Sequence, residues 1–349
     1  MLPCVARRDP GEVLVKLAPA QTKEADMAVT PATAQLPRLL RNQWHLFFDP
    51  DEEPRLRVQS GGRAVVETED AHIGSIRTEK DVYKSLAEVF EKLGGANPVT
   101  GPIYVEGVEP GDCVAMTIED IVPGAVQGQG YTVLTPGLGG LVSNYSLQPA
   151  LEARTVIAKI KDRKVRFPTA KGIVEIPTAP FLGTIGLAPA KERKLSFVQG
   201  PDFLGNVDLP LNGIGATIVM RANVPGGLVS FGDAHAVQGD GEISGAAIEC
   251  QADVTVKLER VPKASAEYVA LPQVNTPDFI GSIAAFTGVH SADCIRAAYI
   301  DIINRMVQFH GFTMPEAYLL ACQTARVRIG QVVDPLYSAA VTIERRYIS

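Results

Sequence analysis

Hydrophobic and polar residues alternate over many short stretches of this chain. Residues 54–70 and 102–122 alternate around turns that contain glycine or proline, and each stretch predicts a β-hairpin. Residues 216–231 and 246–261 form longer β-like runs. The chain's 32 glycines and 25 prolines punctuate many such elements. The pattern therefore predicts a body built mainly of short strands and turns.

Three stretches have the spacing of amphipathic helices instead. Residues 80–95 place apolar side chains at helical intervals before a Gly-Gly stop, and residues 291–311 end in a glycine. Residues 313–330 open with Thr313 and Glu316, the pattern of a capping box. No regular βαβ spacing is present. We therefore predict an α+β fold that is mainly β: a β-sandwich-like body of short antiparallel strands, with a helical pair near the C-terminus.

The length of 349 residues fits two domains or one large β-rich domain. Charged residues interrupt the apolar positions of residues 1–37, so we expect a poorly ordered N-terminal extension there. Residues 38–349 are expected to fold together, as two intertwined β-rich subdomains of about residues 38–180 and 181–349.

Charge and cysteine content narrow the partners and the compartment. The net charge of −6 and the pI of about 5.5 argue against nucleic acid or an anionic membrane as a partner. No apolar run is long enough for a transmembrane helix, and the N-terminus lacks the pattern of a signal peptide. The five cysteines lie far apart without a C-x-x-C pair. These features predict a cytoplasmic protein without a disulfide framework.

The stretch FGDAHAVQGDGE, residues 231–242, is dense in side chains that bind metals or move protons. It holds two aspartates, a histidine, a glutamate and three glycines. One interpretation is a polar turn between two buried strands, because Asp and Gly favour turns. The other is a metal site: Asp233 and His235 are two residues apart, so in an extended strand they share a face and could share Zn²⁺ or a similar ion. The spacing alone leaves both interpretations open.

The same stretch resembles the characteristic motif of the acetamidase/formamidase family. Other segments resemble this family in order along the chain: HLFFDP (45–50), VVETEDA (65–71), TGPIYVEGVEPGD (100–112), FLGTIGLAP (181–189), GNVD (205–208) and RIGQVVDP (328–335). The resemblance marks residues 38–349 as a catalytic region. It implies metal-dependent hydrolysis of a small amide, such as formamide, acetamide or a small lactam, to a carboxylate and ammonia.

The resemblance also implies the metal ligands. Asp70 and Asp208 match the family and join Asp233 and His235 as predicted ligands. The expected cofactor is a divalent metal, zinc first, with calcium or a second metal ion as alternatives. His72, the neighbour of Asp70, is interpreted as an exposed loop histidine rather than as a ligand.

Further roles follow from the same resemblance. Glu106 and Glu242 are the two glutamates that match the family, and both are predicted to carry protons; Glu106 is preferred because Glu242 could equally brace the glycine-rich loop. The predicted substrate contacts are His45, Asn206 and Gly183. The expected partners are a small amide and further copies of the chain, in a homo-oligomer of two subunits or more.

One alternative function remains open from the sequence. A non-enzymatic, β-rich protein that binds a metal or a small ligand would use the same carboxylates without turnover. Amidases with a nucleophilic serine or cysteine are disfavoured, because their signatures, such as G-x-S-x-G, are absent. Two departures from the family bear on the choice of amide: Phe181 and the pair Phe203-Leu204 replace the family's usual residues.

Overall fold

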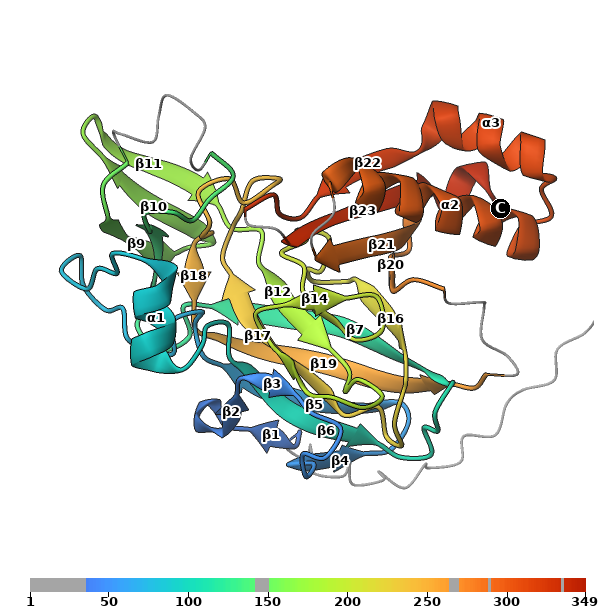
Figure 1. The fold of residues 1–349 in the computed structure, drawn as a ribbon, viewed down its shortest axis with the longest axis horizontal. Helices are drawn as coiled ribbons and strands as arrows, with labels where there is room; N and C mark the ends of the chain where they lie inside the picture. Colours follow the sequence, from blue (N-terminus) through green and yellow to red (C-terminus); the bar gives the residue numbers. More distant parts are fainter. Residues whose placement is uncertain (1–35, 142–150, 264–269, 288–289, 334–335) are drawn as a thin grey trace, which may run out of the picture. The chain divides into compact units, whose positions relative to one another are not determined.

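Two large β-sheets dominate the architecture of this chain (Figure 1). The structure, a computed structural model, describes residues 36–141, 151–263, 270–287, 290–333 and 336–349. Residues Leu36–Ser349 form one compact unit. The extension predicted over residues 1–37 lies outside the described residues, except for its last two positions.

Within the described residues, the first sheet has nine strands. In spatial order these are β1 (Arg38–Leu39), β5 (Gly62–Thr68), β19 (Ala252–Val261), β7 (Cys113–Pro123), β16 (Thr217–Arg221), β20 (Gln273–Asn275), β21 (Phe279–Thr287), β23 (Leu336–Glu344) and β22 (Arg326–Ile329). Neighbours pair antiparallel except β1 and β5, which are parallel.

The second sheet contains twelve strands over the same described ranges. Its main path is β11 (Gly172–Pro177), β10 (Lys164–Thr169), β9 (Arg154–Lys161), β8 (Gln129–Leu134), β18 (Glu249–Cys250), β17 (Val229–His235), β12 (Phe181–Gly186), β15 (Leu204–Asn206) and β14 (Gln199–Gly200). Strand β6 (Val99–Val105) joins it through β17 and also pairs with β2 (Trp44–His45) and β4 (Leu56–Val58). A small third sheet pairs β3 (Phe47–Phe48) with β13 (Lys194–Leu195).

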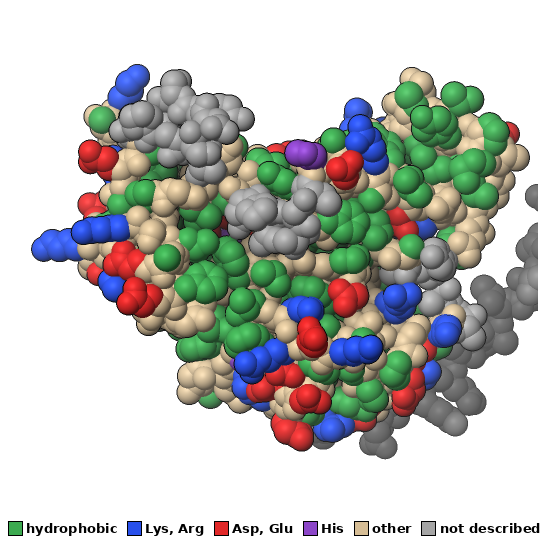
Figure 2. All heavy atoms as spheres, viewed as in Figure 1, with side chains coloured by type: hydrophobic (Ala, Val, Ile, Leu, Met, Phe, Trp, Pro, Cys, Tyr) green, Lys and Arg blue, Asp and Glu red, His purple; other side chains and the backbone are tan. Residues whose placement is uncertain are grey.

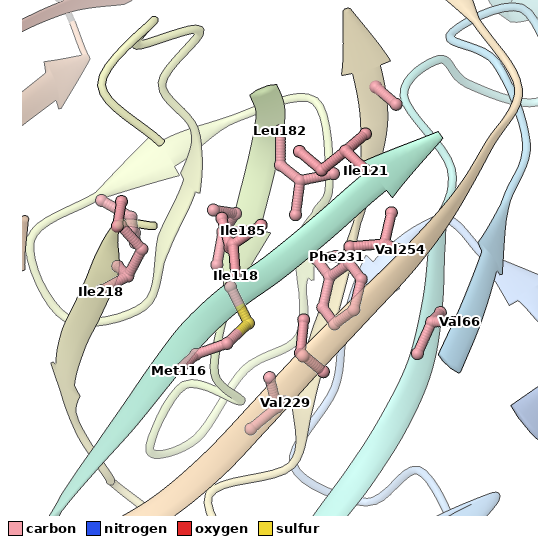
Figure 3. Close-up of a cluster of buried hydrophobic side chains, with 14 of the residues drawn as sticks. Val66, Met116, Ile118, Ile121, Leu182, Ile185, Ile218, Val229, Phe231 and Val254 are labelled. Atoms are coloured by element: carbon pink, nitrogen blue, oxygen red, sulfur yellow. The ribbon is translucent and has the colours of Figure 1, made fainter. Parts of the chain in front are cut away.

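The main hydrophobic core lies between the two large sheets (Figure 3). Strands β5, β7, β16 and β19 of the first sheet supply Val66, Met116, Ile118, Ile121, Ile218 and Val254; strands β12 and β17 of the second supply Leu182, Ile185, Val229 and Phe231. Alternation is clearest in β19, where every second side chain is buried along most of the strand. The predicted fold class, mainly β with a sandwich-like body, is confirmed.

Neither predicted hairpin forms, and this part of the prediction is wrong. Strands β4 and β5 flank the Gly-Gly turn of residues 54–70, but β4 pairs with β6 and β5 pairs with β19. Strands β6 and β7 of residues 102–122 likewise belong to different sheets. Alternation shows that a strand has a buried face and says nothing about its partner. Both turns carry the chain from one sheet to the other.

The helices follow the prediction with shifted ends. Helix α1 (Leu86–Leu93) begins six residues later than the predicted start at residue 80, because Ser85 caps its first turn. Helix α2 (Ser291–Phe309) matches the prediction closely. Helix α3 (Met314–Thr324) has the predicted capping box of Thr313 and Glu316. It is shorter than predicted, because the chain turns into strand β22 after Ala325. Two short 3₁₀ helices, Arg41–Gln43 and Arg345–Tyr347, complete the described helices.

The C-terminal helices form a layer on one end of the first sheet. Helix α2 packs against β21 and β23, and α3 packs against α2 (Figure 1). A second core of small and branched side chains fills this contact. The outer face of the layer keeps large apolar side chains exposed, as the space-filling view shows (Figure 2): Ile300, Met314, Tyr318 and Leu319.

Candidate active site

The predicted metal ligands of residues 231–242 lie on β17, a strand that is buried along its whole length. Val229 and Phe231 point into the core, and regular alternation would turn Asp233 and His235 the same way. Instead Ala234 and Ala236 occupy the next core positions. The backbone of Asp233 has a φ of +56°, in the left-handed region, and this residue shifts the alternation by one position. Asp233 and His235 therefore face away from the core, into the site.

Three acidic residues of the site share this unusual backbone. Asp208, Asp233 and Glu242 have φ values of +46°, +56° and +47°. Such a conformation costs a non-glycine residue on the order of 1–3 kcal/mol and persists only where the surroundings enforce it. The surrounding chain thus holds all three carboxyl groups in place against the local preference of the backbone.

These carboxyl groups meet the histidine at short range. The side chains of Asp208, Asp233 and His235 each present one ligand atom, and these atoms all lie within 4.8 Å of one another. His235, Glu242 and Glu249 form an overlapping set within the same limit. The His235 Nε2 atom lies 3.3 Å from Asp233 Oδ1 and 3.2 Å from Glu249 Oε2. We call these five residues the carboxylate cluster.

A glycine forms the floor under this cluster. A Cβ atom added to Gly183 of β12 would lie 2.5 Å from Asp208 Oδ1, 2.6 Å from Asp233 Oδ2 and 3.0 Å from His235 Cε1. Gly183 also holds Asp208 by its carbonyl, which accepts the backbone N–H of Val207 at 2.9 Å and of Asp208 at 3.1 Å. Gly183 is predicted from the sequence to contact substrate; the structure places it directly behind the predicted ligands.

The cluster is short of hydrogen-bond donors. In the part of the chain that the structure describes, neither carboxylate oxygen of Asp208 has a hydrogen-bond partner, and Glu249 Oε2 meets only His235 Nε2. Asp233 is better supplied, since Oδ2 accepts from Asn97 Nδ2 at 2.8 Å and from Thr184 Oγ1 at 3.1 Å. A buried carboxylate without partners is costly. The donor set of carboxylates and one imidazole fits a divalent cation, which would supply the missing partner.

The tautomer of His235 points to the same conclusion. The Gln238 side chain donates from Nε2 to the carbonyls of Asp208 and Gly330, at 2.8 and 3.1 Å, so its Oε1 must face His235 Nδ1, at 2.8 Å. Because that oxygen only accepts, Nδ1 carries the proton. In a neutral ring, Nε2 then directs a lone pair at two carboxylates. This arrangement is stable only with a proton or a cation between them.

Burial and mutual repulsion shift the pKa values of the cluster. Burial, then Glu242 and Asp233, raise the pKa of Asp208 well above its usual value. Burial raises the pKa of Glu242 to about 8 and that of Glu249 to about 7. Burial lowers the pKa of His235, but Glu249 and Asp233 outweigh it and the net pKa is well raised. Without a cation, the cluster therefore retains protons at neutral pH.

The four carboxyl groups of the cluster line a small cavity of about 40 Å³. Its other walls include the polar residues Asn97, Asn206 and His72. Asn206, a predicted substrate contact, accepts a hydrogen bond from Thr184 Oγ1 at 2.9 Å. Phe181 packs edge-on against the His235 ring, with 4.9 Å between ring centroids, and thereby restrains the imidazole. Phe203 packs on Phe48, away from the cavity lining.

Asp70 is buried near this cavity and lies outside the carboxylate cluster. Its Oδ2 forms an ion pair with Arg77 Nη1 at 2.6 Å. Its Oδ1 accepts from the backbone N–H groups of His72 and Gly74 and from the Tyr131 hydroxyl, at 3.0–3.1 Å. The structure thus gives Asp70 four protein donors in place of the predicted metal.

Glu106 and His45 also lie apart from the cluster. Glu106 forms an ion pair with Arg57 at 3.3 Å, and its side chain is 34% exposed. His45 Nδ1 contacts the carbonyl of Phe47 at 2.6 Å, and its Nε2 lies 3.3 Å from Ser230 Oγ. Neither residue lines the cavity. The structure therefore does not bring the preferred proton carrier and the predicted histidine contact to the site.

Sequence reasoning missed Glu249, which stands directly opposite His235 in the pairing of β18 with β17. It lies in the β-like run of residues 246–261, where nothing in the sequence distinguishes it as a functional residue. Gln238 was visible in the glycine-rich stretch, but only the contacts of both ends of its amide reveal its role. Strand pairing and amide orientation are invisible in one sequence.

Comparison with known proteins gives the family of this chain. The family model described as the Acetamidase/Formamidase family matches residues 26–200 and 196–344. A Schizosaccharomyces pombe protein named as a formamidase is 24% identical, over 84% of this chain and 86% of its own length. Crystal structures of acetamidases from Yersinia enterocolitica and Bacillus halodurans are 29% and 28% identical, with TM-scores of 0.80 and 0.78. The alignments cover 91% of this chain and 94% of the Yersinia chain, and 89% of this chain and 98% of the Bacillus chain.

A γ-lactamase from Delftia acidovorans shares the fold, with a TM-score of 0.58 at 20% identity, over 88% of this chain and 90% of its own. The family match spans most of the chain, so this protein belongs to the acetamidase/formamidase family. It is a hydrolase of carbon–nitrogen bonds other than peptide bonds, acting on linear amides. This decides between the two functions left open by the sequence, in favour of the enzyme.

Proposed function

We propose that the carboxylate cluster binds a divalent metal ion and hydrolyses a small primary amide to a carboxylate and ammonia. The observation that supports this best is Asp208, whose two buried oxygens lack hydrogen-bond partners among the described residues and face Asp233 and His235. Asp208, Asp233 and His235 would hold the ion, and Glu249 stands within reach of the same centre. When bound, a divalent cation acidifies water and polarises a carbonyl group. Zinc suits the mixed imidazole and carboxylate donors, as predicted from the resemblance.

The chain's own residues must supply the proton balance. Hydrolysis adds a hydroxyl to the carbonyl carbon and a proton to the leaving nitrogen, because NH₂⁻ does not depart as such. Glu242 and Glu249 are buried at the cavity, and burial raises their pKa values to about 8 and about 7. These values describe the metal-free protein; in the metal-loaded enzyme it is their place at the cavity wall that makes either carboxyl group a candidate to carry the proton to nitrogen. Glu242 keeps the role that the resemblance implied, and Glu249 joins it in place of Glu106.

The size of the cavity bears on the substrate. The cavity of about 40 Å³ is small, which favours the smallest amides, formamide and acetamide, over a five-membered lactam. We accordingly place the lactam last among the amides considered.

A chelator-controlled assay tests the proposed function. Ammonia release is measured on formamide, acetamide, propionamide and 2-pyrrolidinone, with metal content determined on the same preparation. We expect turnover of the two smallest amides, loss with a strong chelator, and recovery on adding Zn²⁺. Full activity in chelator-treated protein without detectable metal would contradict the metal-dependent mechanism.

The compartment and the oligomeric state are proposed from other features of the chain. None of the described helices is long and apolar enough to cross a membrane. The described cysteines Cys113, Cys250, Cys294 and Cys322 are free, which agrees with a reducing compartment such as the cytoplasm. We also propose that the chain forms a homo-oligomer, as the resemblance implies; exposed apolar side chains such as Tyr318 and Leu319 agree with a contact between copies. Light scattering tests this: a monomer at micromolar concentration would contradict it.

A further inference from the structure

A second group of polar residues, all buried except a 31% exposed Arg77, adjoins the cavity next to the carboxylate cluster. It consists of Asp70, Arg77, Tyr131 and His72. Sequence analysis interpreted His72 as an exposed loop residue; that interpretation is wrong, since His72 is only 9% exposed. Its ring stacks on Tyr83, with 5.6 Å between ring centroids and 23° between planes, and meets the Tyr131 ring edge-on at 5.6 Å. The imidazole is therefore held in one orientation.

The hydrogen bonds of this group determine which ring nitrogen of His72 carries the proton. Asp70 is ion-paired with Arg77, so its carboxylate is ionised and can only accept. The Tyr131 hydroxyl, 3.1 Å from Asp70 Oδ1, therefore gives its single proton to Asp70. Its oxygen must then accept from both groups that contact it: the His72 backbone N–H at 3.2 Å and His72 Nδ1 at 2.9 Å. Nδ1 is consequently the protonated nitrogen of His72.

This assignment leaves a lone pair on Nε2. No described residue forms a hydrogen bond with that nitrogen, and His72 lines the cavity together with Asn97, Asp233 and Glu249. Burial lowers the pKa of His72, although Asp70 and Asp233 oppose it, which keeps the ring neutral at neutral pH. His72 thus brings to the cavity wall a ring that has an accepting nitrogen without a partner among the described residues.

We propose that His72 is the general base of the amide hydrolysis, oriented by Tyr131 and Asp70. This inference rests on the proposed function. As the oxygen of a cavity water bonds to the amide carbon and the C=O π pair moves onto oxygen, the water proton passes to His72 Nε2. Glu242 or Glu249 protonates nitrogen; the pair on oxygen then re-forms C=O as the C–N bond breaks with its pair on nitrogen, which gives the carboxylic acid and ammonia. His72 then returns its proton to the carboxyl group that gave one up, directly or through water.

The base and the acid then stand on different parts of the cavity wall. When Nε2 takes up a proton, the imidazolium can keep its Nδ1–H bond to Tyr131, whose own proton stays on the ionised Asp70. The negative charge of Asp70 stabilises that imidazolium through the tyrosine. The Asp70–Arg77 pair lies outside the cluster, but it has a function in this proposal. Through Tyr131 it determines which ring nitrogen of His72, the residue that touches substrate, carries the proton.

The first test removes the imidazole. His72→Ala is expected to lower kcat by about 10²–10⁴-fold while the metal content stays at the wild-type value. Because the substitution opens a space the size of the ring, added imidazole should restore part of the activity. Loss of the metal would make His72 a ligand and overturn the proposal, and so would wild-type activity or a failure of imidazole to restore any.

The second test uses two tyrosines that both pack on His72. Tyr131→Phe removes the acceptor of Nδ1–H, and we expect kcat to fall about 10–100-fold with KM unchanged. Tyr83→Phe keeps the ring that stacks on His72 and removes only a hydroxyl that bonds to Ser75 Oγ, at 2.8 Å, so it should lower kcat far less than Tyr131→Phe does. Equal effects of the two substitutions would overturn the positioning role of Tyr131.

A measurement on the wild-type protein avoids any folding defect of the variants. ¹⁵N NMR of the metal-loaded enzyme should show His72 with a protonated Nδ1 and an unprotonated Nε2; the opposite tautomer overturns the proposal. The proposed function has its own test in the chelator assay. An enzyme that needs metal but is indifferent to His72→Ala would refute this inference alone.

Discussion

Asp70 and Asp208 are two buried aspartates near one cavity, and their surroundings differ completely. They are 0% and 1% exposed, respectively. Asp70 receives a guanidinium, two backbone N–H groups and a tyrosine hydroxyl. Asp208 has no hydrogen-bond partner within the described ranges and faces other carboxyl groups.

The difference shows that donors, rather than burial, decide what a buried carboxylate can do. A carboxylate that its own chain has fully satisfied gains little from a cation, whereas an unsatisfied one gains a great deal. The Asp70 region is therefore a completed network that stabilises the fold and orients His72. The Asp208 region is completed only by a proton or by a ligand from outside the chain.

The largest effect of this difference is expected for the substitution Asp208→Asn. We expect the variant to lose its metal and with it nearly all ammonia release, a larger effect than the about 10²–10⁴-fold typical of a lost proton transfer. The metal-free variant should melt no lower than metal-free wild type, because the substitution removes a carboxyl group whose ionisation is opposed by burial and by Glu242 and Asp233. Metal analysis, an ammonia assay and thermal melting check this. A variant with full metal content would remove Asp208 from the ligands.

The matched substitution in the other region is Asp70→Asn. It removes the carboxylate that four donors meet, while Arg77, 31% exposed, keeps Glu69 Oε1 at 3.4 Å, so the free energy of unfolding should fall by about 1–3 kcal/mol. The folded fraction should still bind metal, because Asp70 lies outside the cluster. Urea denaturation with the metal content of the folded protein measures both effects. If Asp70→Asn loses metal at unchanged stability, the sequence-based assignment of Asp70 as a ligand is right after all.

Much of the fold could be predicted from the sequence, because alternation and capping are local. Strand β19 and the capping box of Thr313 and Glu316 follow from residues that are neighbours in the chain. The partners of β4 and β5 do not, because pairing depends on segments far away. Hence the two hairpins were predicted wrongly while the class of fold was right.

The same distinction between local and distant contacts applies to the site. Asp233 and His235 could be paired from their spacing, although the left-handed backbone at Asp233, rather than regular alternation, brings them to the site. Glu249 and Gln238 could not be assigned roles, since they depend on strand pairing and on hydrogen bonds to distant carbonyls. Glu106 and Glu242 both match the family, and the preference for Glu106 depends only on the second role open to Glu242; a family match cannot show that Arg57 is the neighbour of Glu106.

The stability of the metal-free protein at a series of pH values tests the unsatisfied state of the cluster without any substitution. In the metal-free protein, burial raises the pKa of Glu242 to about 8 and that of Glu249 to about 7, from a usual 4.5. The folded state thus binds more protons than the unfolded state, and the free energy of unfolding falls as pH rises towards 8 and above. The raised pKa of His235 acts in the same direction.

Chelator-treated protein should therefore melt at a lower temperature at pH 9 than at pH 6. Added Zn²⁺ should stabilise it most at the higher pH, where the cluster is most fully ionised. Calorimetry at a series of pH values, with and without metal, measures both trends. A melting temperature of the metal-free protein that rises over this range would contradict the unsatisfied state of the cluster.

A smaller effect is expected from Gln238→Ala. Gln238 fixes the tautomer of His235 without entering the cluster, so its loss should weaken metal binding about 10–100-fold. Asp240→Asn is the control: it changes the same glycine-rich stretch, but Asp240 faces Arg328, at 2.8 Å. Competition with a metal indicator gives both affinities. Equal affinities in the two variants would mean that Gln238 does not orient the ligand.

The smallest effect is expected from Glu106→Gln, where the sequence and the structure lead to opposite results. The family match predicts a loss of kcat by about 10²–10⁴-fold, the size of a lost proton relay. The structure places Glu106 in a partly exposed ion pair with Arg57, outside the cavity, and pairs of this kind contribute about 0–1 kcal/mol to stability. We therefore expect kcat, KM and metal content to stay at wild-type values. Glu242→Gln, the same change at the cavity wall, should lower kcat by the factor that the family match assigns to Glu106. If Glu106→Gln lowers kcat and Glu242→Gln does not, the proton carrier lies outside the cluster and the site drawn here is incomplete.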